Sequence, residues 1–318
     1  MVKLKIIVTG ASGFIGSRLV KKLSLAGHDV MGLTRSSDKK YLNNNIRWIT
    51  ADLALPATYK DKVQSFQPNV VIHLAWQDIP DFSLIKSKSN LNQSIDFLSL
   101  ILEMKSCKKI LVSGSCFEYN NQNGSCKESD INSANNHFTW AKLSLYSWLL
   151  MKCDEKNISL GWMRFFYVYG PGQRLESLIP TIFLSLKNKK LPPLNNPNNA
   201  NDYVFIDDVV NSLCFGVTHK ISSGIFNIGS GFSTSVLDIL RRAESIVLES
   251  NILTKQLEKI AKKSATKTNF WADISKAKKE LNWTPKTSID RGKPDYSGLE
   301  VPTFVYFSND FIKNGKVI

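Results

Sequence analysis

Three glycines, Gly10, Gly13 and Gly16, stand in "VTGASGFIG", where a β-branched run gives way to a helical pattern. Glycine is needed where a turn is tight, where backbone approaches a pyrophosphate and where a helix packs closely on a strand. The helix that follows would offer free N–H groups and the positive end of its dipole to phosphates. The motif requires this strand–turn–helix context, so the sequence predicts a dinucleotide-binding turn. Its expected cofactor contacts are Gly10, Ser12, Gly13, Phe14, Ile15 and Gly16.

The end of the second expected strand bears on which dinucleotide binds. An acidic residue there would hydrogen-bond a ribose 2′-OH and favour NAD. The sequence has "LTRSS" instead, and Arg35 could meet a 2′-phosphate. This favours NADP, with NAD as the alternative, while a solvated surface arginine is the other interpretation of Arg35. Further cofactor contacts are expected where the third and fourth strands end, at Asp52, Leu53, Leu74, Ala75 and Trp76.

These residues must be positioned by an alternation of strands and helices in the first half of the chain. Strands are expected at 3–10, 28–35, 46–53, 68–76, 108–115 and 158–170, and helices at 12–27, 86–106 and 138–155. The strand at 68–76 is apolar throughout, as in a buried parallel sheet. Alternating βαβ units with right-handed crossovers predict an α/β fold of the Rossmann type, with a doubly wound parallel sheet.

The pattern changes after Gly170. A helix and a Pro/Asn-rich loop occupy 171–201, and a strand–helix–strand pattern over about 203–229 is expected to return toward the sheet. Residues 233–290 are mostly helical in pattern. The predicted organisation is therefore an NAD(P)-binding domain at 1–169 and a smaller, mostly helical substrate-binding region at 170–292, interleaved with the sheet. The tail at 293–318 is left unassigned.

Composition narrows the class of protein. With 318 residues and a hydrophobic fraction of 43%, the chain can bury a sizeable core. The five cysteines are an odd number without metal-ligand spacing, which indicates free thiols in a reducing compartment and no metal site. No secretory h-region and no apolar run of about 18 residues is present, so we expect a cytoplasmic protein without a membrane span.

The net charge of +14 is concentrated between residues 255 and 293, where lysines recur at helical spacing. A basic balance can indicate nucleic acid, an acidic membrane surface or a phosphorylated small ligand. No interleaved aromatics or recognition motif favours nucleic acid. We therefore interpret this segment as a solvated lysine-rich face and expect no nucleic-acid partner.

Several motifs in order resemble the extended short-chain dehydrogenase/reductase family, which works on nucleotide sugars. They are "TGASGFIG", "ADL", "HLAW", "GSCFEY", "RFFYVYGPGQ", "DYVFIDDVV", "FNIGSG" and "ADISKAKKELNWTPK". Within that family the chain looks most like bacterial reductases of NDP-4-keto-6-deoxyhexoses. The resemblance implies a nucleotide-diphosphate sugar as substrate, a role in surface polysaccharide synthesis, and a homodimer formed through helices near 90–105 and 140–155.

The resemblance also implies a catalytic set. In such enzymes a tyrosine hydroxyl transfers the proton, a lysine holds the nicotinamide ribose and lowers the tyrosine pKa, and a Ser or Thr hydroxyl binds the same oxygen. The matching positions here are Phe138 for the tyrosine, Lys142 for the lysine and Ser115 for the hydroxyl. Phenylalanine cannot transfer a proton, so Cys116 and Tyr167 are candidate replacements. A small buried hydrophobe is the other interpretation of Cys116.

Other positions depart from the family pattern. Cys116 and Phe117 stand where 4,6-dehydratases carry an acidic pair, which argues against a dehydratase. Asn201 replaces an arginine that often holds the substrate diphosphate, and Arg174 or lysines at 187–190 could substitute for it. The expected substrate contacts are Cys116, Phe117, Tyr167, Gln173, Arg174 and Asn201.

Two classes of function follow. The first is an NAD(P)-dependent nucleotide-sugar reductase or epimerase with rerouted proton transfer. The second is a catalytically impaired member of the family that still binds dinucleotide, as a sensor, a partner subunit or a decayed copy. The glycine turn, Ser115 and Lys142 favour the first class, whereas Phe138 and Asn201 favour the second.

Overall fold

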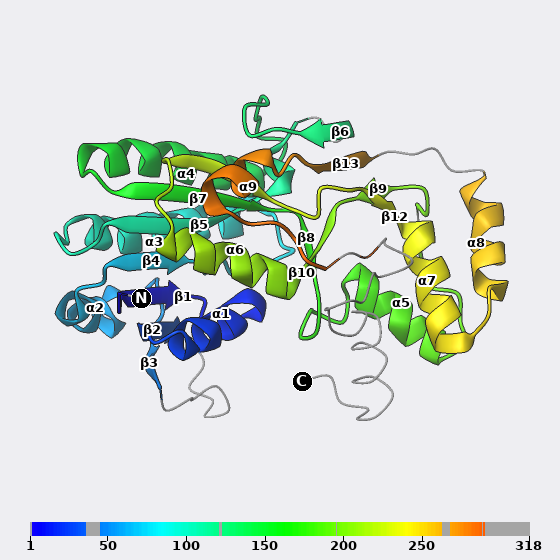
Figure 1. Ribbon diagram of the computed structural model, residues 1–318, viewed down its shortest axis with the longest axis horizontal. Coiled ribbons are helices and arrows are strands. Elements are labelled where there is room, and N and C mark those ends of the chain that lie inside the picture. The colour runs from blue at the N-terminus through cyan, green and yellow to red at the C-terminus, as the bar shows by residue number, and fades with distance from the viewer. Residues whose placement is uncertain are drawn as a thin grey trace.

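The computed structural model describes residues 2–35, 45–120, 123–194, 196–262, 268–287 and 289, and its centre is a seven-stranded parallel sheet (Figure 1). The strand order is β11-β7-β5-β4-β1-β2-β3. The strands are β1 (Lys5–Thr9), β2 (Asp29–Thr34), β3 (Ile46–Thr50), β4 (Val70–His73), β5 (Lys109–Ser115), β7 (Ser159–Phe165) and β11 (Gly224–Ile228). The predicted Rossmann-type α/β fold is therefore confirmed. The tail at 293–318 lies outside the described residues.

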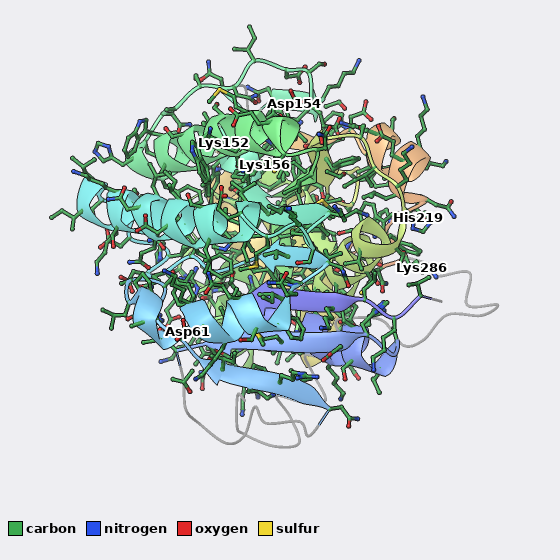
Figure 2. All side chains as sticks on the ribbon, turned by 90° about the vertical axis from the view of Figure 1, so that its left-hand side faces the viewer. Asp61, Lys152, Asp154, Lys156, His219 and Lys286 are labelled. Atoms are coloured by element: carbon green, nitrogen blue, oxygen red, sulfur yellow. The ribbon has the colours of Figure 1, made fainter. Side chains whose placement is uncertain are left out.

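Helices cover both faces of this sheet, which explains why its central strands are apolar on both sides. On one face α2 (Lys60–Phe66), α3 (Leu84–Leu102) and α4 (His137–Glu155) form one buried cluster with the strands. On the other face α1 (Phe14–Leu25), α6 (Ile206–Thr218) and α9 (Ser275–Leu281) form a second. Figure 2 views the molecule with α4 above α3. Lys152 on α4 pairs with Glu155, and Lys156, at the C-cap of α4, pairs with Glu103.

A smaller region lies beyond the carboxyl ends of the strands, on the right in Figure 1. Its core joins α5 (Leu178–Lys187), α7 (Val236–Leu248) and α8 (Ile252–Ala261). Two small sheets connect it to the main domain. These contain β8 (Tyr167–Tyr169) with β10 (Tyr203–Phe205), and β12 (Thr234–Ser235), β9 (Ala200–Asn201), β13 (Asn269–Ala272) and β6 (Asn123–Cys126).

The prediction of a single strand over 158–170 is wrong. It breaks at Phe166, whose N–H bonds Ile228 O, and the next N–H, of Tyr167, bonds Asp202 O. Because the hydrogen bonds change partner there, β7 stays in the main sheet while β8 pairs with β10. Of the segment predicted to return toward the sheet, β11 pairs with β7 in the main sheet, whereas β10 lies in the small sheet with β8. The proposed boundary at residue 169 stays a prediction.

The described lysines between 255 and 293 are mostly exposed, including Lys255, Lys259, Lys262, Lys278 and Lys279, as expected of a solvated face. No helix in the described ranges is both long and apolar enough to cross a membrane.

Trp283 anchors the last described residues to the main domain. The ring is 1% exposed and packs in the cluster of α1, α6 and α9, and its Nε1 donates to Asp208 O at 2.9 Å. The Asp208 carboxylate accepts the N–H groups of Lys286 and Thr287.

We expect Trp283→Phe to lower the free energy of unfolding by about 1–3 kcal/mol, because it removes this hydrogen bond and leaves a small void. The measurement is urea unfolding followed by circular dichroism. Trp140→Phe is the matched control: Trp140 is 38% exposed on α4, and its replacement should change stability by less than about 0.5 kcal/mol. Equal losses in both variants would contradict the anchoring role.

Candidate cofactor and active site

The turn between β1 and α1 is packed too tightly for side chains. Gly10 has φ +66°, and a Cβ added there would lie 3.0 Å from Ala75 N. A Cβ on Gly16 would lie 2.1 Å from Gly10 O. Gly13 is the N-cap of α1 and supplies no side-chain hydrogen bond to the first turn. The N-terminal N–H groups of α1 are thus left for an external acceptor, which fits a pyrophosphate.

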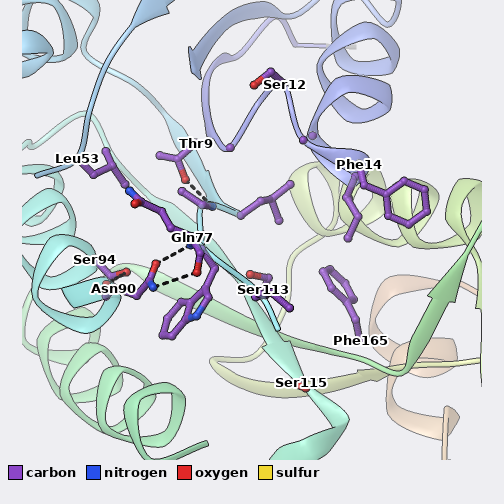
Figure 3. Close-up of a pocket in the computed structure, with 18 of the residues that line it drawn as sticks. Thr9, Ser12, Phe14, Leu53, Gln77, Asn90, Ser94, Ser113, Ser115 and Phe165 are labelled. Carbon is purple, nitrogen blue, oxygen red and sulfur yellow. Dashed lines mark hydrogen bonds between the residues drawn. The ribbon is translucent and has the colours of Figure 1, made fainter. Parts of the chain in front are cut away.

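A cavity of about 660 Å³ opens over this turn at the carboxyl ends of the strands (Figure 3). All six predicted residues of the glycine turn line it. It is also lined by Arg35, Leu53, Leu74, Ala75 and Trp76, by Ser115, Phe138 and Lys142, and by Arg174. One cavity therefore joins the predicted dinucleotide-binding turn to the residues that the sequence singled out for catalysis.

Six predicted site residues are not among those that line this cavity, namely Asp52, Cys116, Phe117, Tyr167, Gln173 and Asn201. The Asp52 carboxylate accepts Ala54 N, which closes a local turn. The Gln173 amide donates to Val168 O. Asn201 lies in the four-stranded sheet, where it accepts from Thr268 and donates to the Tyr203 hydroxyl.

A set of amides on one wall of the cavity was not predicted from the sequence. Gln77 N donates to Asn90 Oδ1 at 2.6 Å, and Asn90 Nδ2 returns a bond to Gln77 O at 3.2 Å (Figure 3). Gln77 Nε2 donates to Gln93, and Arg35 donates to Gln77 Oε1 at 3.0 Å. The available signal was the polar face of α3: Asn90, Gln93 and Ser94 recur at helical spacing, yet Asn90 and Ser94 are buried.

His73 underlies the cavity as a buried neutral imidazole. Its Nδ1 is 2.9 Å from Thr9 Oγ1 and its Nε2 is 3.0 Å from Ser94 Oγ. Since Ser94 donates to Asn90 O, Nε2 carries the proton and Nδ1 accepts from Thr9. Burial, and secondly the charge of Lys142, lowers the pKa of His73 to about 3. His73 therefore holds the end of β4 in place.

Lys142 lies on α4 with its ammonium in the core of the site. The side chain is 3% exposed, Nζ donates to Ser113 O at 2.8 Å, and Nζ lies 3.9 Å from the centre of the Trp76 ring. Burial lowers the pKa of Lys142 to about 7, against the opposing charge of Glu118. Lys142 can thus change protonation state near neutral pH.

This lowered pKa predicts a pH-dependent stability. Between pH 7 and about 10.4 the unfolded chain holds a proton that the native chain has lost, so the free energy of unfolding should rise with pH across that window. The rise due to Lys142 is at most about 1.4 kcal/mol per pH unit. Urea unfolding of the native chain and of Lys142→Met at pH 6, 7, 8 and 9 measures it.

The free energy of unfolding of the native chain minus that of Lys142→Met should rise from pH 7 to 9 and should stay constant below pH 7. Lys152→Met is the control, because Lys152 is exposed and pairs with Glu155. A difference between native chain and Lys142→Met that does not change with pH would contradict the assignment.

Phe138 belongs to an aromatic cluster at the cavity. Its ring stacks on Phe82 with centroids 4.8 Å apart and meets Trp76 edge-on at 5.5 Å. Phe82 in turn contacts Phe117, and Phe117 contacts Tyr167. Lys142 Nζ lies 5.9 Å from the centre of the Phe138 ring. The residue in the tyrosine position is therefore packed against an apolar wall, with the lysine beside it.

Ser115 ends β5, and its hydroxyl accepts a hydrogen bond from Phe117 N at 3.2 Å. The two other candidate proton donors do not share the cavity. Burial raises the pKa of the Cys116 thiol well above its ordinary value and also raises the pKa of the Tyr167 hydroxyl. Of the catalytic candidates with polar side chains, Ser115 and Lys142 are the ones that line this cavity.

The comparison with protein families decides the classification. The model of the NAD dependent epimerase/dehydratase family matches residues 6–229. The chain belongs to this family. An NAD-dependent family fits the glycine turn and the cavity that opens above it, and it confirms the resemblance at the level of the extended short-chain dehydrogenase/reductase fold.

Two curated relatives and one solved structure show the range of this epimerase/dehydratase family. The uncharacterized UDP-glucose epimerase YtcB of Bacillus subtilis is 30% identical, with 91% of this chain and 95% of the relative covered. The dTDP-6-deoxy-L-talose 4-dehydrogenase (NAD(+)) of Aggregatibacter actinomycetemcomitans is 29% identical, with 79% and 93% covered. A tyrosine-to-phenylalanine mutant of UDP-glucuronic acid 4-epimerase from Bacillus cereus, solved with UDP-4-deoxy-4-fluoro-glucuronic acid and NAD, is 25% identical, with TM-score 0.71 and 90% and 95% covered.

Proposed function

We propose that this protein is an NAD(P)-dependent reductase that acts on C4 of a nucleotide-linked 4-keto-6-deoxyhexose. The observation that carries the proposal is the shared cavity: Ser115 and Lys142 line it together with the glycine turn. The bound cofactor supplies the hydride. The carbonyl carbon gains that hydride and the oxygen gains a proton, so the ketone becomes an alcohol and the cofactor is oxidised.

The residues of the chain must then bind the carbonyl oxygen and deliver the proton. The Ser115 hydroxyl already accepts from Phe117 N, so its own proton is directed to another acceptor, which in the complex is the carbonyl oxygen. Phe138 contributes no hydroxyl. Lys142, with its pKa of about 7, is the proposed proton source, relayed by water or by the Ser115 hydroxyl.

The aromatic wall supports a deoxy sugar. Phe138, backed by Phe82, presents apolar surface to the cavity, where a sugar hydroxyl would lose its hydrogen bonds to water, whereas a 6-methyl group would lose nothing. The dTDP-6-deoxy-L-talose 4-dehydrogenase among the relatives oxidises a 6-deoxy sugar at C4 by name. Reduction of the 4-ketone is the reverse of that reaction, and a nucleotide-sugar epimerase, as the relative YtcB is by name, stays the alternative.

We propose NADP as the preferred cofactor, with NAD as the alternative. Arg35 lines the cavity and is exposed, and its bond to Gln77 could be exchanged for a 2′-phosphate. The NAD bound in the Bacillus cereus epimerase structure supports the alternative.

The substrate diphosphate and a second subunit each have a proposed contact surface. No arginine occupies the Asn201 position, so Arg174, which lines the cavity and donates to Ile79 O, is the proposed contact to the substrate diphosphate. We also propose a homodimer through α3 and α4, whose surfaces expose Ile85, Trp140 and Met151.

A spectrophotometric assay tests the function. Oxidation of NADPH and of NADH is followed with a panel of dTDP-, UDP- and CDP-linked 4-keto-6-deoxyhexoses, beside the matching 6-hydroxylated nucleotide sugars and the free sugars. Turnover confined to nucleotide-linked 4-keto-6-deoxy sugars is the expected result. Tight cofactor binding without turnover on any ketone would overturn the reductase.

One observation favours a second candidate, a family member that binds dinucleotide but is catalytically impaired. The Trp76 ring lies over the Lys142 ammonium and Phe138 is packed between Trp76 and Phe82, so the catalytic corner is largely filled with apolar rings. Cofactor binding without turnover in the same panel is the result that this candidate predicts.

A further inference from the structure

A carboxylate is fully buried directly beneath Ser115. Glu118 ends the short 3₁₀ turn η3 (Cys116–Glu118) that follows β5, and its side chain is 0% exposed. It accepts Ser115 N at 2.7 Å, Trp162 Nε1 at 2.9 Å and Arg164 Nε at 2.7 Å. Arg164, from β7, is equally buried and lies over the Tyr119 ring. The turn that follows β5 and the neighbouring strand β7 thus place an ion pair behind the active site.

This pair is costly as a purely structural element. Removing two charges from water costs several kcal/mol per ion, and well-packed apolar residues often replace a buried pair without loss of stability. The charge therefore calls for a role that an apolar pair could not fill. Its contacts with the site residues indicate one.

Ser115 is held from two sides. Glu118 accepts the Ser115 N–H, while the Ser115 hydroxyl accepts the Phe117 N–H, which together make a reciprocal capping box. With one lone pair of its hydroxyl engaged, Ser115 can direct its proton toward the cavity that it lines. The negative charge of Glu118 also favours the charged form of the nearby Lys142.

We propose that Glu118, compensated by Arg164, is a positioning residue that holds the Ser115 hydroxyl as a hydrogen-bond donor toward the substrate oxygen. The inference rests on the proposed reductase function. Glu118 contacts neither cofactor nor substrate and acts through Ser115.

A double-mutant cycle tests this role. Because Glu118→Leu, which removes the acceptor of the Ser115 N–H, would alone leave Arg164 buried without its partner, the neutral pair Glu118→Leu/Arg164→Met is used beside the single variant. We expect the neutral pair to lower kcat about 10-fold, the loss of one oriented hydrogen bond, with the substrate KM and the cofactor Kd changed less than about 2-fold. Ser115→Ala should lower kcat about 10²-fold.

The decisive variant combines Ser115→Ala with the neutral pair. If Glu118 acts through the Ser115 hydroxyl, the combination should be no slower than Ser115→Ala alone. Amide hydrogen exchange at 113–118, a measurement independent of turnover, should be faster in the neutral pair than in the native chain. Control exchange at 5–9 in β1 should be unchanged.

Losses in kcat that multiply in the combined variant would overturn the inference, as would a neutral pair with native kcat. Kinetics are measured in the native chain and in the Phe138→Tyr parent. An absence of turnover in both parents overturns the proposed function and the inference with it, whereas multiplying losses in an active parent overturn the inference alone.

Discussion

Replacing Phe138 by tyrosine is expected to raise kcat by about 10²–10⁴-fold, the usual contribution of a positioned general acid. The Phe138 ring lines the cavity, and Lys142 Nζ lies 5.9 Å from its centre, so the added hydroxyl would enter the cavity beside the ammonium. The charge of Lys142 would lower the pKa of the new hydroxyl and improve it as a donor. Single-turnover oxidation of the reduced cofactor measures the gain in the chemical step.

Phe117→Tyr is the matched control, because it adds the same hydroxyl to a ring of the same cluster that is not among the residues lining the cavity. It should leave kcat within about 3-fold of the native value, since no new acid reaches the carbonyl oxygen. Equal gains in both variants, or no gain in Phe138→Tyr, would contradict the assignment of position 138.

The second large effect is expected at Gly16. In Gly16→Ala the new Cβ would meet Gly10 O at 2.1 Å and Ala11 Cα at 2.9 Å, and backbone cannot yield as a side chain can. The start of α1 would have to move away from β1, at a cost of about 1–3 kcal/mol in stability. Because the same turn places the N–H groups that would bind the pyrophosphate, the cofactor Kd should rise about 10- to 100-fold.

Calorimetric titration with NAD(H) and NADP(H), beside thermal unfolding, measures both losses. Gly216→Ala serves for comparison, since Gly216 lies in α6 and its Cβ would meet only the flexible end of Leu111 within 3.5 Å. That variant should bind the cofactor with native affinity. Native cofactor affinity in Gly16→Ala would show that the turn is not the phosphate site.

Most of the fold could be predicted from local sequence patterns. Apolar β-branched runs indicate buried strands, and helical periodicity indicates which face of a helix is buried. The run over 5–9 and the glycines after it specify one strand, one turn and one helix without help from distant residues. The break at Phe166 was not predictable in this way. The apolar pattern runs on through Tyr169, and the change of sheet depends on carbonyls of Asp202 and Ile228, far away in sequence.

The site residues likewise fall into those that could be predicted from the sequence and those that could not. Residues at the ends of strands, such as Leu74 and Ser115, could be placed because parallel strands end at one edge of a sheet. The amides of Gln77 and Asn90 line the cavity because the polar side of α3, which carries Asn90, is turned inward against the loop after β4, which carries Gln77. The exclusion of Cys116 and Tyr167 from the cavity likewise follows from packing against β13, where Phe270 contacts the Tyr167 ring.

The most direct test of the proposed reductase follows the transferred hydride with a deuterium label. The native chain is incubated with NADPH or NADH carrying two deuterium atoms at C4 of the nicotinamide and with a dTDP-linked 4-keto-6-deoxyhexose, and the product is analysed by mass spectrometry and NMR. A reductase places one deuterium on C4 of the sugar and releases oxidised cofactor in equal amount. Sugar without deuterium, or a cofactor that stays bound and fully deuterated, would contradict the reductase.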